Sequence, residues 1–207
     1  MDVAASSAGT LTGHPVPGLT LWVRSTPHPP TPNLEEISAH HRIVADAWER
    51  RPAVLPVRFG QWFATVGELT SALEPHLERY TAALERTAGT GEFSVRIQDP
   101  GLAVPEAAAA GSGTAYLRGI AARERARRDA TSRGMEVAAE MRGALGGLVI
   151  DERVDPLTEP QWLAAATHLV RRRDEEEYRA AADRFAALHG ELRFVRTGPW
   201  PPWSFTA

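Results

Sequence analysis

Apolar residues recur at every second position in several short stretches of the chain. Leu19, Leu21 and Val23 do so between residues 18 and 25, and this period of two predicts a half-buried strand. The stretch 92–97 gives the clearest strand prediction, because its apolar residues alternate with a serine and an arginine. Short apolar runs predict further strands at 53–59, 147–154, 162–170 and 192–195. The run 162–170 is ambiguous: its alanines favour a helix, whereas its length and the helix start that follows it favour a strand.

Apolar residues spaced three and four apart predict four helices. The first runs from Asn33 to about Arg50, and the second from Thr65 to about residue 88. Asn33 and Thr65 are N-cap residues, each with a glutamate three positions later. Pro75 lies inside the second helix and predicts a kink or two abutting helices there. The third helix runs towards Leu145, and the fourth begins near residue 174 and stops at the glycine at 190.

The order of these elements indicates two modules. Residues 92–207 follow the order strand, helix, strand, strand, helix, strand, which is the βαββαβ order of a ferredoxin-like domain. Residues 18–91 follow the order strand, helix, strand, helix, and residues 1–17 are expected to be a flexible N-terminus. We therefore predict an α+β fold with two α/β-type modules, the C-terminal one ferredoxin-like.

Composition narrows the classes of function. The chain has 207 residues, a net charge of −3 and no cysteine, so it offers no disulfide, no cysteine-based zinc site and no broad basic surface for nucleic acid. All 23 basic residues are arginines, which we attribute to a GC-rich genome. Residues 1–15 lack the pattern of a secretory signal, and no apolar run reaches the ~18–20 residues of a membrane span, so we expect a cytoplasmic protein.

Candidate chemistry is sparse. His40 and His41 are the only adjacent histidines, with Glu36 one helical turn before His40, but neighbouring positions on a helix point about 100° apart and cannot easily share an ion. No catalytic signature or phosphate-binding glycine loop occurs. We therefore expect no catalytic residues, no metal and no cofactor. Two alternatives stay open: a ferredoxin-like nucleic-acid-binding module, and a small-molecule enzyme whose catalytic residues come together only in space.

Two stretches concentrate prolines and aromatic residues: "VLPVRFGQWF" at 54–63 and "TGPWPPWSF" at 197–205. The prolines of the second stretch favour polyproline II geometry, in which Trp200 and Trp203 would project from the same edge. Such a stretch can cover the protein's own core, or it can form a rigid hydrophobic contact site for a partner. We expect substitution of Trp200 by alanine to destabilise the fold, and the less buried tryptophan to contact a partner.

These stretches carry a resemblance to a known family. "AHHRIVADAW" (39–48), "VLPVRFG" (54–60), "FSVRI" (93–97) and "TGPWPPWSF" resemble motifs of the gas vesicle protein F/L family, and the resemblance covers about residues 18–206. Trp203 stands where the family usually has a tyrosine, and "QWF" after Gly60 is unusual for it. The strand that typically opens family members is not evident in residues 1–17.

The resemblance implies a non-enzymatic accessory protein of gas vesicle assembly, located in the cytoplasm and associated with gas vesicles. It implies two α/β modules, the C-terminal one ferredoxin-like, and contacts with the small hydrophobic shell protein and with other accessory proteins. Neither nucleic acid nor a membrane span is expected. The candidate interaction residues are those of the two proline-rich motifs: Pro56, Arg58, Phe59, Gly60, Gly198, Pro199, Trp200, Pro201, Pro202, Trp203 and Phe205.

Overall fold

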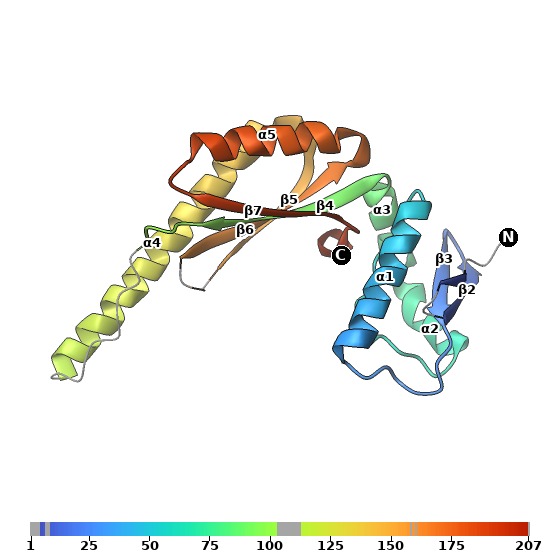
Figure 1. Cartoon of the computed structure of the whole chain (residues 1–207). Coiled ribbons are helices and arrows are strands. Elements are labelled where there is room, and N and C mark those ends of the chain that lie inside the picture. Colours follow the sequence, from blue (N-terminus) through green and yellow to red (C-terminus); the bar gives the residue numbers. More distant parts are fainter. Residues whose placement is uncertain (1–4, 7–8, 103–112, 158, 160, 207) are drawn as a thin grey trace. The chain divides into compact units, whose positions relative to one another are not determined.

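The structure is a computed structural model that describes residues 5–6, 9–102, 113–157, 159 and 161–206 (Figure 1). The chain forms two compact units, and we consider each by itself. The N-terminal unit comprises residues 1–90 together with 200–207, and the C-terminal unit comprises residues 91–199. The sequence placed residues 200–207 in the C-terminal module, whereas their contacts group them with the N-terminal unit.

A small antiparallel sheet opens the N-terminal unit. Its strands β1 (Ala5–Ser6), β2 (Gly9–Val16) and β3 (Leu19–Arg24) lie in that order. Val16 pairs with Leu19, which leaves a two-residue turn whose Gly18 has a φ of 81°. The expectation of a flexible segment at 1–17 was therefore wrong for residues 9–16. Pairing with β3 stabilises this strand, although its sequence has little apolar alternation.

Helix starts in this unit follow the predicted caps. Helix α1 (Leu34–Arg50) begins after Asn33, whose Oδ1 accepts a hydrogen bond from the Glu36 amide at 2.9 Å. Helix α2 (Val66–Leu73) begins after Thr65, whose hydroxyl accepts from the Glu68 amide at 3.1 Å. Both caps satisfy amides that have no partner within the helix.

Of the two alternatives at Pro75, the structure has two abutting helices. A 3-10 turn (Glu74–His76) containing Pro75 separates α2 from helix α3 (Leu77–Thr87). The strand expected at 53–59 is absent from the described structure, where this segment is a loop. Pro56 is buried there and has no N–H to donate to a sheet, so it interrupts strand pairing in the middle of the apolar run.

The C-terminal unit follows the predicted βαββαβ order. Its elements are β4 (Thr90–Gln98), α4 (Gly113–Leu145), β5 (Val149–Pro156), β6 (Trp162–Arg171), α5 (Glu175–Leu188) and β7 (Arg193–Trp200). The strand order β5-β6-β4-β7 is compatible with a ferredoxin-like sheet. The ambiguous run at 162–170 is thus a strand, as the helix start after it suggested. The alanine- and glycine-rich sequence at 99–114 predicts a loop between β4 and α4, and it lies mostly outside the described residues.

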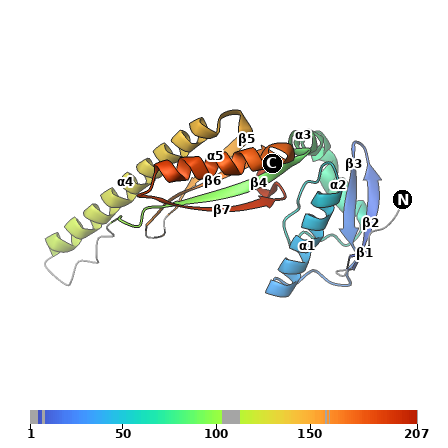
Figure 2. The ribbon, with the colours of Figure 1, turned by 45° about the horizontal axis from the view of Figure 1, so that its top comes forward.

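One contiguous core joins this sheet to both helices, which lie over the same face of the sheet (Figures 1 and 2). Phe93, Val95 and Ile97 of β4 are at most 1% exposed, as their alternation predicted. Gly134 of α4 lies directly against β6, because a Cβ built there would be 2.6 Å from the Leu163 carbonyl oxygen. Only a residue without a side chain allows this close approach of helix and strand.

The two ends of α5 are exposed to solvent in different ways. The Asp174 side chain makes no capping hydrogen bond, and the carboxylates of the first turn of α5 complement the helix dipole. Leu188, the last residue of α5, is 82% exposed. In α4, core contacts begin at Ala130. The part of the helix before this residue extends beyond the sheet (Figure 1).

Candidate interaction surface

Helix α1 joins two of the motif segments through His40. Its Nε2 lies 2.6 Å from the Val57 carbonyl oxygen. A carbonyl only accepts, so Nε2 carries the proton and donates. The same imidazole contacts the Phe59 ring edge-on, with the ring centroids 5.8 Å apart. The loop 53–60 is therefore tied to α1 by a hydrogen bond and a ring contact rather than by strand pairing.

The C-terminal motif packs on the same helix. The indole of Trp203 lies 4.8 Å from the His41 ring and 6.1 Å from the His40 ring, centroid to centroid. Phe205 is fully buried, and its carbonyl accepts a hydrogen bond of 2.8 Å from Arg86 of α3. These contacts lie within the N-terminal unit. We call His40, His41, Phe59 and Trp203 the motif junction.

The backbone of the C-terminal motif is not a continuous polyproline II helix. Residues up to Trp200 belong to β7, and Trp203–Phe205 form a 3-10 turn that begins after Pro202 at a ψ of 63°. The two tryptophans therefore have different environments: Trp200 is 50% exposed, whereas Trp203 is partly buried in the junction. That Trp200→Ala destabilises the fold stays a prediction, and the partial burial of Trp203 leads us to expect a larger effect there. As the less buried of the two, Trp200 is the tryptophan expected to contact a partner.

The other motif residues of the N-terminal unit differ in how far they are exposed. Pro56, Pro201 and Pro202 are buried, whereas Arg58 and Gly60 are exposed. Gly60 has a φ of 94° and no atom within 4 Å of a Cβ built on it. The loop around it also exposes apolar side chains, since Val57 is 55% exposed and Trp62 is 41% exposed.

Gly198 and Pro199 belong to the C-terminal unit and do not join the junction. The peptide bond between them is cis. Gly198 has a φ of 115°, and a Cβ there would lie 2.6 Å from the Glu92 carbonyl oxygen. Arg179 donates to the Gly198 carbonyl at 3.1 Å and stacks over the Phe93 ring at 4.8 Å. These contacts make Gly198 a packing residue of the sheet.

Sequence reasoning missed one buried polar network. His168 has no histidine or acidic residue close to it in sequence and is therefore expected to be isolated. In the structure its ring is fully buried, with Nε2 2.9 Å from a Glu152 carboxylate oxygen and Nδ1 2.8 Å from the Tyr178 hydroxyl. The carboxylate accepts from Nε2, and in that tautomer Nδ1 accepts from the tyrosine. The available signal was the period of β6, which places residue 168 on the same face as core residues Ala166 and Val170.

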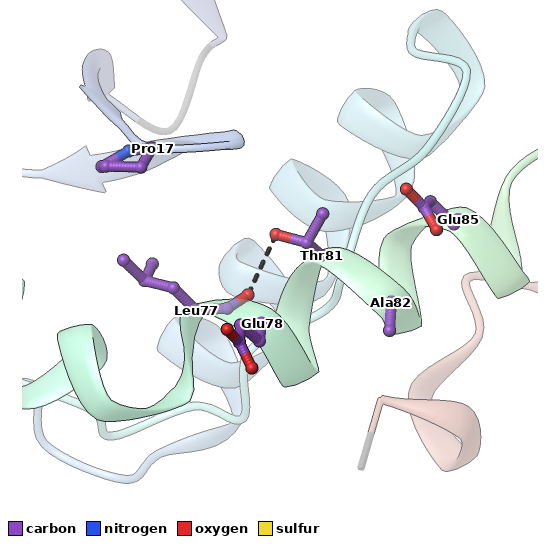
Figure 3. A pocket seen from close by; sticks show the side chains of 6 residues that line it. All are labelled: Pro17, Leu77, Glu78, Thr81, Ala82 and Glu85. Atoms are coloured by element: carbon purple, nitrogen blue, oxygen red, sulfur yellow. Dashed lines mark hydrogen bonds between the residues drawn. The ribbon is translucent and has the colours of Figure 1, made fainter.

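The chemistry of this network is that of a packed core. Burial raises the pKa of the Tyr178 hydroxyl above its ordinary value, so the phenol stays protonated. Two cavities among the described residues have no histidine in their lining. One, of about 370 Å³, lies between Pro17 and α3 (Figure 3), and the other, of about 220 Å³, lies under β7 beside Phe194 and Arg196. Among the described residues, no cluster of three or more histidines and acidic residues is arranged to hold a metal.

Comparison with known proteins identifies the family. The family model described as "Gas vesicle synthesis protein GvpL/GvpF" matches residues 6–207. The chain belongs to this family. It is 27% identical over 201 residues to gas vesicle protein F of a Streptomyces species, and the matched region covers 90% of this chain and 84% of that protein. It is 24% identical over 173 residues to gas vesicle protein F1 of Halobacterium salinarum, with coverages of 83% and 68%.

Solved structures of the family share the fold. The structure of the gas vesicle protein GvpF from an Anabaena species superposes with a TM-score of 0.78 at 14% identity, covering 97% of this chain and 87% of that chain. That of GvpF from Microcystis aeruginosa superposes with a TM-score of 0.73 at 14% identity, covering 96% and 89%. The mixed α+β fold is therefore the one predicted. Family membership gives the chain a role related to gas vesicle assembly. No helix of the described residues has the length and hydropathy to cross a membrane.

Proposed function

We propose that this chain is a non-enzymatic accessory protein of gas vesicle assembly that binds the small hydrophobic shell protein and other accessory proteins at the gas vesicle. The observation that supports this most is the motif junction. Three segments that the family resemblance singled out, separated by up to about 160 residues in sequence, meet at His40 and His41 of α1.

The junction suits recognition of an apolar partner. A shell subunit must expose large apolar surfaces before it packs against its neighbours, and such surfaces aggregate in water. Phe59 and Trp203 are held by contacts to α1, so binding a partner costs little ordering of these side chains. Exposed Val57 and Trp62 border Phe59 in sequence and extend the apolar surface on that loop.

The remaining polar groups favour a binding role over catalysis. Of the described residues, the one hydroxyl–imidazole–carboxylate arrangement is that of Tyr178, His168 and Glu152. Its imidazole and phenol are fully buried, so a substrate does not reach them. The proline-rich loops thus offer surface for partners, and the histidine network contributes to the core.

The test is co-purification of the tagged chain with the shell protein after co-expression. We compare the unmodified chain with Val57→Asp, which places a charge in the exposed motif loop. The control is Leu188→Asp, which places a charge at an exposed apolar site of α5. Both side chains are exposed, so neither change is expected to unfold the protein.

We expect the unmodified chain and Leu188→Asp to retain the shell protein, and Val57→Asp to lose most of it. Failure of the unmodified chain to retain it would refute shell-protein binding. Equal retention by both variants would show that binding uses another surface.

A further inference from the structure

The first half of α4 lies outside the hydrophobic core of the C-terminal unit. We call residues 113–129 the arm, which extends beyond the sheet (Figure 1). None of the arm side chains that the structure describes belongs to the hydrophobic core, and the core contacts of α4 begin at Ala130. The arm nevertheless carries large apolar side chains near its beginning: Tyr116 is 57% exposed, Leu117 65% and Ile120 41%. Tyr116 and Ile120 are four residues apart, so they lie on the same helix face.

The arm is also basic, although the chain as a whole is acidic. It holds five arginines and two acidic residues, a net charge of +3, whereas the whole chain has a net charge of −3. Glu124 is engaged internally, since it accepts hydrogen bonds from Arg127 at 2.9 Å and Arg128 at 3.3 Å. These hydrogen bonds lower the pKa of Glu124, which stays ionised. Arg123 follows Tyr116 by seven residues and lies on the same face as Tyr116 and Ile120.

A complementary surface exists in the N-terminal unit. The groove between the β2–β3 turn and α3 is lined by Pro17, Leu77, Thr81 and Ala82, with Glu78 and Glu85 at its side (Figure 3). Its volume of about 370 Å³ can hold one or two large side chains. The two glutamates are seven residues apart on α3, or about 10 Å along the helix. Within the part of the chain that the structure describes, neither carboxylate makes an ion pair.

We propose that the arm of one copy of this chain docks in the groove of a second copy. Tyr116 and Ile120 insert between Pro17 and Leu77 as helix anchors. Arginines of the arm then pair with Glu78 and Glu85, and this charge complementarity fixes which surfaces meet. Each partner brings what the other lacks: apolar side chains with positive charge on the arm, and an apolar groove with negative charge on α3.

The contact is heterologous, because the arm and the groove are different surfaces of the chain. Each copy that uses its arm keeps its own groove free, so copies add head to tail until a ring closes. The contact area is small and partly ionic, and we therefore expect reversible association that weakens with salt. This assembly does not depend on the binding of a shell protein.

Sedimentation equilibrium of the purified chain over a range of concentrations tests the proposal. We expect the weight-average mass to rise with concentration at low salt and to fall towards the monomer at about 0.5 M salt. The arm variant Tyr116→Asp/Ile120→Asp and the groove variant Glu78→Arg/Glu85→Arg should each stay monomeric. The control Glu49→Arg/Glu74→Arg makes the same charge change at two other exposed glutamates of the N-terminal unit and should associate at least as well as the unmodified chain.

Mixing the two defective variants gives the sharpest result. The arm variant still has a normal groove and the groove variant a normal arm, so an equimolar mixture should form a heterodimer and stop at two copies. Circular dichroism confirms that each variant is folded.

A monomeric unmodified chain up to about 1 mM would overturn the proposal. So would association of the arm variant equal to that of the unmodified chain, or a mixture that stays monomeric. Arm-dependent binding of RNA or anionic vesicles by a chain that remains monomeric would overturn it too, and would assign the basic arm to a nucleic acid or a membrane surface.

Discussion

Substitution of Gly198 by alanine tests whether the glycine of the C-terminal motif serves the fold. The change adds one methyl group at a residue with a φ of 115°, a conformation that side chains rarely adopt. That methyl group would lie 2.6 Å from the Glu92 carbonyl oxygen and 3.2 Å from the Phe93 Cα. Both neighbours are backbone atoms of the central strand β4, so they cannot rotate away as a flexible side chain does.

The expected loss of stability has two parts and one offset. Holding alanine at this φ costs about 1–3 kcal/mol, and forcing the methyl group into a packed sheet costs about 1–3 kcal/mol more. The alanine restricts the unfolded chain and returns about 0.4–1 kcal/mol. The free energy of unfolding should therefore fall by about 3 kcal/mol. For a chain of this length that corresponds to a drop in Tm of roughly 6–12 °C.

Gly60→Ala is the matched control. Gly60 also belongs to a motif and has a φ of 94°, but no atom lies within 4 Å of the added methyl group. Gly60→Ala should lose only the free energy that it costs to hold alanine at a positive φ. After the stabilising effect of the restricted unfolded chain is subtracted, this loss is about 1–2 kcal/mol. Urea unfolding followed by circular dichroism and tryptophan fluorescence measures both. If Gly198→Ala were as stable as Gly60→Ala, the close approach to β4 would not be a source of stability, and the packing argument would be wrong.

Three further predictions concern other contacts. Trp203→Ala should lower the Tm more than Trp200→Ala, because the Trp203 indole packs on α1 while Trp200 is 50% exposed; an equal drop would contradict the assignment. Gly134→Ala should destabilise the chain by about 1–2 kcal/mol, because the added methyl group clashes with β6. Gly143 lies in the same helix with open space around it, so Gly143→Ala should stabilise the chain by about 0.5–1 kcal/mol. Urea unfolding measures both, and changes in the free energy of unfolding that have the same sign would refute this. Burial raises the pKa of Tyr178, so as the pH rises the unfolded state releases this proton before the folded state does. The free energy of unfolding should therefore fall as the pH rises above 10.0. Urea unfolding at a series of pH values should show a smaller fall for Tyr178→Phe.

The sequence predicted those elements whose signals are local. The caps at Asn33 and Thr65, and the helix interruption at Pro75, each depend on residues within a few positions of one another. The alternation around Phe93 predicted β4 for the same reason, since one face of that strand is buried in a single core. Element order then gave the βαββαβ module without any knowledge of which strands pair.

What the sequence did not reveal depends on contacts between distant residues. Strand β2 is stabilised by its pairing with β3, so its own residues show little alternation. The loop at 53–60 has the composition of a strand, but hydrogen bonding of Val57 to His40 replaces sheet pairing. His168 looked isolated because Glu152 and Tyr178 reach it from a neighbouring strand and from the next helix. The motif junction itself was visible only as separate motifs.

The contact of residues 200–205 with the N-terminal unit has a consequence for biosynthesis. A unit made of one continuous segment can fold as soon as that segment leaves the ribosome. Here the unit that contains residues 1–90 is complete only when residues 200–207, more than a hundred residues further along the chain, have been synthesised. Until then His41 and the Arg86 guanidinium lack Trp203 and the Phe205 carbonyl as partners. The first unit to be synthesised is therefore the last to be completed, and a ribosome that stalls before residue 200 leaves a nascent chain whose apolar junction is open to chaperones.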